Sequence, residues 1–157
     1  MELLLRHFWI AFIAVTCINI IIWRFRGRRY IEANPELEDG YARLTRGALL
    51  WGNAPWIVMG FGCTFGDVPS VFHYFRPRDG NPYVLAFFAS VIVLWIAGFR
   101  WLFFRNGAEE LIKHPGLFNW NITSPTFIKL IYTLCVFSGV IALVMMFVID
   151  VPLAPIP

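Results

Sequence analysis

Charged residues are scarce in this chain, and none lies deep inside its long apolar runs. Of the 157 residues, 15% are charged and 59% are hydrophobic. A soluble domain usually has about 25% charged residues. The apolar residues fall into four runs of roughly membrane-spanning length, without the short repeat of an amphipathic strand or helix. This pattern excludes an ordinary soluble domain and indicates an integral membrane protein.

Cysteine clusters and catalytic motifs are also missing. The three cysteines, Cys17, Cys63 and Cys135, all lie inside apolar runs, and no CxxC spacing occurs. This excludes a zinc site and a disulfide framework of the usual kinds. The sequence has no GxSxG, HExxH or Walker loop. We therefore predict no catalytic residue, no metal and no cofactor, and expect a protein that is not an enzyme.

The apolar runs predict an all-α bundle of four transmembrane helices, forming one domain over residues 1–157. The expected spans are residues 3–23, 48–66, 83–104 and 127–149. Two short amphipathic helices are expected on the cytoplasmic side. The first follows Asn34-Pro35, lies along the inner surface and leads into the second span. The second is capped by Asn106 and stopped by Pro115-Gly116.

Basic residues are distributed unequally between the two sides of the predicted bundle. Three lie on the predicted outer side, Arg6, Arg76 and Arg78. Ten lie on the inner side: Arg24, Arg26, Arg28, Arg29, Arg43, Arg46, Arg100, Arg105, Lys113 and Lys129. Because basic loops stay in the cytoplasm, we expect both termini outside it, in a bacterial-type inner membrane. The net charge of +3 reflects this topology, and no nucleic-acid partner is expected.

The second apolar run is interrupted by Gly52, Asn53 and Pro55, which predicts a broken helix. Asn19 and Thr133 are expected at nearly the same depth as Asn53. The three side chains predict a polar layer of interhelical hydrogen bonds, each contributing about 0.6 kcal/mol. The alternative is a small-molecule or ion site beside the broken helix.

The outer half of the second run predicts close helix packing. Gly62 and Gly66 form a GxxxG motif, and Ala86 and Ser90 form a small-residue pair on the third run. Small residues at this spacing let two membrane helices approach closely. We therefore expect the second and third helices to cross tightly there.

Polar residues on the outer side form a second candidate site. Its members are His7, Asp67, His73, Arg76 and Asp79. The simplest interpretation is a solvated turn in which Asp79 pairs with an arginine. A bis-histidine haem site at His7 and His73, or a lipid-acting enzyme using His73 and Asp67, are the alternatives.

Together these features predict a structural, accessory or assembly component of a membrane complex. Its expected partners are the lipid bilayer and either another membrane protein or further copies of itself. A small oligomeric transporter or channel that uses the second helix is the alternative, and a lipid-acting membrane enzyme is a third hypothesis.

Overall fold

The computed structural model describes residues 5–118 and 122–149, and all regular structure within these ranges is helical. The long helices are α2 (Trp9–Ala33), α3 (Glu38–Phe65), α4 (Pro82–Phe104) and α6 (Pro125–Val148), and α5 (Gly107–Lys113) is short. The connections contain the 3-10 helices η1 (Pro35–Leu37), η2 (Val71–Phe75) and η3 (Pro77–Asp79). In the described chain, three helices, α2, α4 and α6, are long and apolar enough to cross a membrane, as expected of a membrane protein.

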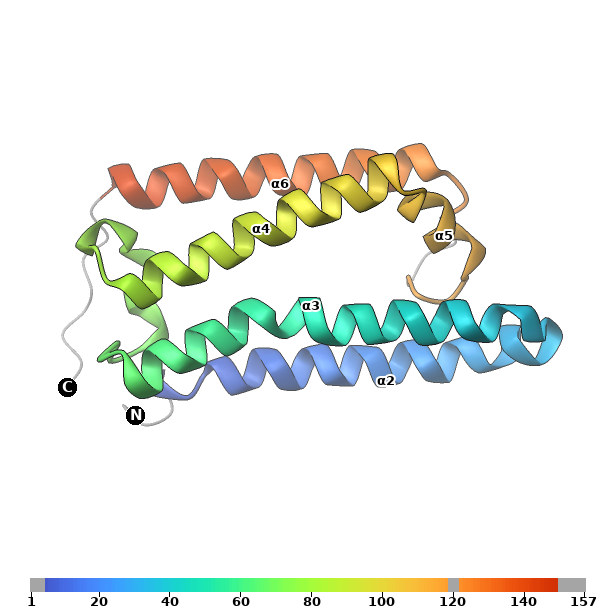
Figure 1. Cartoon of the computed structure of the whole chain (residues 1–157), viewed down its shortest axis with the longest axis horizontal. Coiled ribbons are helices and arrows are strands. Elements are labelled where there is room, and N and C mark those ends of the chain that lie inside the picture. Colours follow the sequence, from blue (N-terminus) through green and yellow to red (C-terminus); the bar gives the residue numbers. More distant parts are fainter. Residues whose placement is uncertain (1–4, 119–121, 150–157) are drawn as a thin grey trace.

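Helices α2 and α3 lie side by side as a long antiparallel hairpin (Figure 1). The pairs in contact along it are Arg6–Cys63, Trp9–Gly60, Phe12–Trp56, Thr16–Gly52 and Gly27–Tyr41. A Cβ at Gly60 would lie 2.8 Å from the Trp9 ring, and one at Gly27 would lie 3.0 Å from the Tyr41 ring. The missing glycine side chains therefore make room for aromatic rings of the opposite helix and fix the register of the hairpin.

The hairpin extends beyond the ends of α4 and α6 (Figure 1). We call its projecting part, residues 24–47, the arm. Helix α3 has 28 residues and is about 42 Å long, whereas a bilayer's hydrocarbon core is about 30 Å thick. Asn34 Oδ1 accepts a hydrogen bond from the Glu36 backbone N–H at 3.2 Å, as the predicted cap requires.

The arm differs from the surface helix that we expected before the second span. Residues 38–47 are the first turns of α3 and continue directly into the rest of that helix. The packing of Gly27 against Tyr41 explains the difference, because it extends the pairing of the two helices beyond the apolar runs. The second short helix, α5, is present and is followed by Gly116 at φ +87°, as expected of a helix stop. The expected cap is wrong, because Asn106 precedes the helix at φ +55° and its side chain makes no capping hydrogen bond.

The link between α3 and α4 follows the turn chemistry of its sequence. Gly80 has φ +75°, a conformation that glycine adopts without steric cost. Asn81 Oδ1 accepts a hydrogen bond from the Tyr83 backbone N–H at 2.9 Å, and α4 begins at Pro82. Ser124 and Pro125 open α6 in the same way. The expected starts of both helices are therefore correct to within two residues.

The close crossing of α3 and α4 is confirmed, although its partner on α4 is Tyr83. A Cβ at Gly66 would lie 2.2 Å from the Tyr83 ring, and one at Gly62 would lie 2.1 Å from Tyr74 Oη. Tyr74 donates a hydrogen bond to the Met59 carbonyl at 3.0 Å. Ala86, which we expected in the crossing, is exposed, because Val84 and Phe87 form the packing face of α4.

The predicted break in the second run is wrong, because α3 continues through Pro55 without interruption. A proline removes one helical hydrogen bond, and α2 packs against α3 at this level, where Phe12 stacks on Trp56 with 4.2 Å between ring centroids. Asn53 and Pro55 also lower the hydropathy of α3, which is not among the helices that qualify as spans by composition.

The glycine contacts predict opposite effects of one substitution at two positions of α3. Gly62→Ala places a methyl group against Tyr74 and Tyr83, and we expect it to destabilise the fold by about 1–3 kcal/mol. Gly47→Ala meets nothing within 4 Å and should be neutral or stabilising by up to about 1 kcal/mol. Unfolding of both variants in detergent micelles measures the difference, and equal losses of stability would show that the crossing is not tight.

Candidate functional site

The residues of the predicted polar layer are not joined by the hydrogen bonds of the described chain. Asn53 is buried, whereas Asn19 and Thr133 are exposed. Asn53 Nδ2 donates to the Leu49 carbonyl and Thr133 Oγ1 to the Lys129 carbonyl, both at 2.8 Å. Both side chains thus form hydrogen bonds with the backbone of their own helices. In the register of the hairpin, Asn19 is level with Leu49, which is one helical turn from Asn53. A ligand bound at this layer stays a prediction.

Asn53 still has one unusual atom. Its side chain is 5% exposed, and its Oδ1 is buried without a hydrogen-bond partner within the described chain. Leaving such a group unpaired costs about 1–3 kcal/mol. The cavities described below are lined by other residues, so this oxygen does not mark a binding site by itself.

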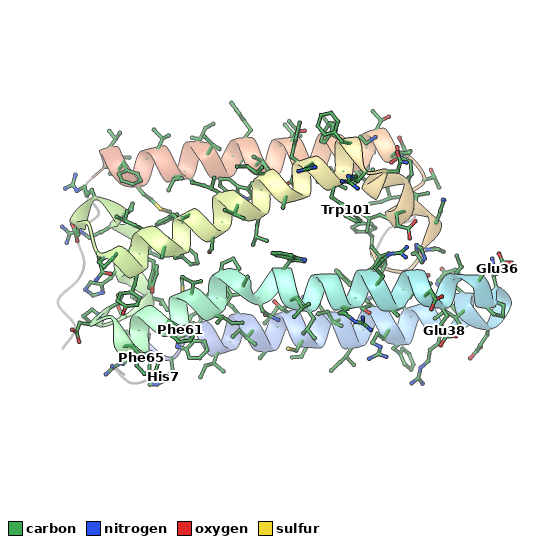
Figure 2. The ribbon with its side chains drawn as sticks, viewed as in Figure 1. His7, Glu36, Glu38, Phe61, Phe65 and Trp101 are labelled. Atoms are coloured by element: carbon green, nitrogen blue, oxygen red, sulfur yellow. The ribbon has the colours of Figure 1, made fainter. Side chains whose placement is uncertain are left out.

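The outer candidate residues lie at the end of the molecule where α2 begins and α6 ends (Figures 1 and 2). The expected ion pair is present, with Arg76 Nε 3.3 Å from Asp79 Oδ2. His73 Nδ1 lies 3.1 Å from Ser70 Oγ, and Asp67 sits in a turn at φ +51°. The described residues contain no group of three or more His, Cys, Asp or Glu that could hold a metal ion. These contacts support a solvated turn.

An apolar cavity of about 470 Å³ lies in the outer half of the molecule, between the ends of α2, α3, α4 and α6. Its walls are Leu5, Phe8, Phe12, Trp56, Met59, Val71, Phe72, Tyr74, Phe75, Phe87, Phe88 and Met146. We call it the aromatic cavity. It has no charged side chain in its walls, so its chemistry favours an apolar group of another helix or a lipid chain.

At the opposite end, the segment after α5 is attached to the arm. The Tyr41 hydroxyl donates a hydrogen bond to the Pro115 carbonyl, and Arg43 forms an ion pair with Glu110. A Cβ at Gly40 would lie 1.8 Å from Nε2 of His114. His114 is 4% exposed, and its Nδ1 bonds the Glu110 carbonyl at 2.7 Å. We call this contact between the arm and α5 the inner junction.

Burial at the inner junction changes the chemistry of Tyr41. Removal of the phenol from water, and to a smaller extent the neighbouring Tyr30, raise the pKa of Tyr41 to about 12, while Arg29 acts in the opposite direction. On the other side of α5, a hydrogen bond from Lys129 lowers the pKa of Glu109, and the two groups pair at 2.9 Å. The Tyr41 hydroxyl thus joins the segment after α5 to α3, and Lys129 joins α5 itself to α6.

Sequence reasoning did not find the inner junction. Residues 40 and 114 are far apart in the chain, and His114 reads as a charge partner for the end of its own helix. Its ring does bond the Glu110 carbonyl there, but it is also buried against Gly40. A glycine inside an otherwise amphipathic helix was the available signal, because it indicates that something approaches the backbone closely.

Comparison with known proteins gives no further information about the site. No protein-family model, no curated protein and no solved structure matches this chain.

The inner junction predicts that Gly40→Ala displaces His114 and releases α5 from the arm. We expect faster hydrogen exchange of the α5 backbone amides, because the new methyl group occupies the position of the imidazole. His114→Ala should restore part of the protection in the double variant, and Gly47→Ala, two turns away in open space, is the matched control. Unchanged α5 exchange in Gly40→Ala would contradict the junction.

A second prediction concerns pH. Because the folded pKa of Tyr41 lies above its ordinary value of 10, its contribution to stability is complete below pH 10 and is lost as the pH rises through about 12. Tyr41→Phe should remove this part of the pH dependence. The measurement is the unfolding midpoint of wild type and Tyr41→Phe across this interval, and parallel curves would refute the assignment.

Proposed function

We propose that this protein is a non-enzymatic accessory or assembly component of a membrane complex, and that α6 and the aromatic cavity receive a helix of the partner. The observation that carries the proposal is the exposure of α6. This helix is long enough to span a membrane, yet no residue of its most apolar 18-residue stretch is buried.

The contacts of α6 with the rest of the chain leave most of its surface uncovered. The Tyr132 hydroxyl donates to the Trp95 carbonyl at 2.6 Å, and the Trp95 ring occupies the space beside Gly139. At the outer end, Met146 reaches the aromatic cavity. A helix that packed beside Met146 would fill the cavity and cover part of α6 in one step.

The shape of the cavity favours a protein over lipid alone. Lipid tails are as apolar as the helices, so association in a membrane depends on close packing. Rigid aromatic walls such as Phe72 and Phe88 supply a fixed shape, and an unfilled space beside them loses dispersion contacts. A conduit would instead need polar groups along its path. The charge-free walls therefore support the accessory role over the transporter alternative.

We also propose that α3 is a fourth transmembrane helix. Helix α3 returns antiparallel to α2, and α4 begins at the end where α2 begins (Figure 1). If α2 and α4 cross the bilayer in the same direction, α3 must cross it in the other. The arm and α5 then lie in the cytoplasm of a bacterial-type cell, and both termini lie outside it, as the distribution of arginines requires.

Photo-crosslinking in the native membrane tests the partner surface. A photoreactive amino acid at Ala142, one turn from Met146 on an exposed part of α6, should give one product of defined mass. The same probe at Ile18 of α2, which is 55% exposed and distant from the cavity, is the control. The mass distinguishes a second copy of this chain from another protein.

Filling the cavity with a larger side chain gives a second test in the same crosslinking experiment. Met146→Trp should abolish the Ala142 product, because the indole would take the space of the partner. Met145→Trp, at a 50% exposed neighbouring position that does not line the cavity, should preserve it. Lipid adducts alone at both probe positions, or equal effects of the two tryptophans, would reject the proposed role.

A further inference from the structure

A groove of about 820 Å³ runs along one face of the arm, between α2 and α3. Helix α2 contributes Ile21, Arg24, Phe25, Arg28 and Glu32, and Glu38 faces them from α3. The α2 positions recur at intervals of three and four residues, so they form one continuous stripe along the helix. The groove is a separate feature from the aromatic cavity, which lies at the other end of the molecule.

The chemistry of the groove changes along the arm. At the end next to the apolar run, Ile21 and Phe25 are 65% and 72% exposed, and Arg24 lies between them along α2. Arg28 follows one helical turn beyond Arg24. Glu32 and Glu38 lie nearest the tip, and Figure 2 shows Glu38 at this end of the molecule. With a rise of 1.5 Å per residue, Glu32 lies about 6 Å beyond Arg28 along α2.

The charged groups of the groove do not neutralise each other. Among the ion pairs and side-chain hydrogen bonds of the described chain, none involves Arg24, Arg28, Glu32 or Glu38. Arg28 and Glu32 are one helical turn apart, a spacing at which opposite charges commonly pair. The groove therefore presents two cationic groups and two anionic groups, in separate positions, to whatever occupies it.

We propose that this groove binds a zwitterionic phospholipid with a primary amine, that is, a phosphatidylethanolamine of the inner leaflet. The acyl chains lie on Ile21 and Phe25. The phosphate lies between Arg24 and Arg28, since guanidinium groups bind phosphate oxygens through paired hydrogen bonds. The ammonium group, beyond the phosphate, donates hydrogen bonds to Glu32 and Glu38.

The two acidic residues distinguish this lipid from the other common classes. The phosphate of an anionic lipid such as phosphatidylglycerol would satisfy the arginines, but the glycerol headgroup has no cation for Glu32 and Glu38. A choline headgroup carries the positive charge but has no N–H group to donate. The formal charges of the four groups sum to zero, which matches a zwitterion, whereas sites for anionic lipids have an excess of basic residues.

Lipid binding to the purified full-length chain tests the proposal. Native mass spectrometry from detergent, with dioleoyl phosphatidylethanolamine, phosphatidylcholine or phosphatidylglycerol added separately, measures each apparent affinity. We expect phosphatidylethanolamine to bind about tenfold more tightly than the other two, because only its headgroup satisfies both pairs of charges. Equal binding of the three lipids, or tighter binding of phosphatidylglycerol, would overturn the proposal.

Two double variants separate the two ends of the headgroup. Arg24→Gln/Arg28→Gln should weaken binding of all three lipids. Glu32→Gln/Glu38→Gln should retain phosphate binding and lose the preference for the amine. Arg100→Gln/Arg105→Gln is the control. It removes two exposed charges outside the groove, one in the last turns of α4 and one directly after that helix, and should leave the affinity for each lipid unchanged.

Retention of the amine preference by the glutamine variant of Glu32 and Glu38 would refute the inference, even if the arginine variant does not fold. An equal loss in the Arg100/Arg105 control would refute it as well, by showing a general effect of charge. Soluble O-phosphoethanolamine should not displace the lipid, since it lacks the chains that cover Ile21 and Phe25, and efficient displacement would point to a soluble ligand instead.

Discussion

The structure depends on the fit of aromatic rings of one helix against glycines of another. In lipid, apolar helices gain little from leaving the solvent, so close contact has to supply their association energy. Trp9 lies over Gly60 and Tyr41 lies over Gly27, which sets the register of α2 and α3 at two distant points. Tyr83 at Gly66 then attaches α4 to the same frame. The hairpin is therefore the part on which the other helices are placed.

The same kind of contact continues beyond the apolar runs and gives the arm its form. The Gly27–Tyr41 pair lies beyond the apolar runs, and His114 occupies the space beside Gly40. Polar groups reinforce this end, since the Tyr41 hydroxyl and the Arg43–Glu110 pair both bind the segment around α5. These contacts hold the two antiparallel helices of the arm together, and the groove on its face therefore has fixed walls.

The sequence predicts the parts of this fold that are encoded locally. Backbone chemistry that acts within a few residues accounts for the caps at Asn34, Asn81 and Ser124 and for the turn at Gly80. Contacts that depend on register could not be predicted in the same way. Asn19 lies one helical turn from the level of Asn53, because distant glycines set the register of the hairpin. Counting residues from the end of each apolar run cannot predict this register. Pro55 lies inside a continuous α3 that packs against α2, and this tertiary context is absent from local propensity.

The two proposed binding surfaces lie at opposite ends, and the packing explains how both can act in one small protein. The inner end is held by the junction of α5 with the arm and by the Lys129–Glu109 pair, which ties α6 to α5. The outer end of α6 has no comparable polar contact among its described residues, and it lies beside a cavity with apolar walls. A partner helix that entered at the outer end, as proposed, would therefore displace lipid and leave the Lys129–Glu109 pair intact. The arm and its groove would keep their geometry in such a complex, because the contacts that define them are separate from the cavity.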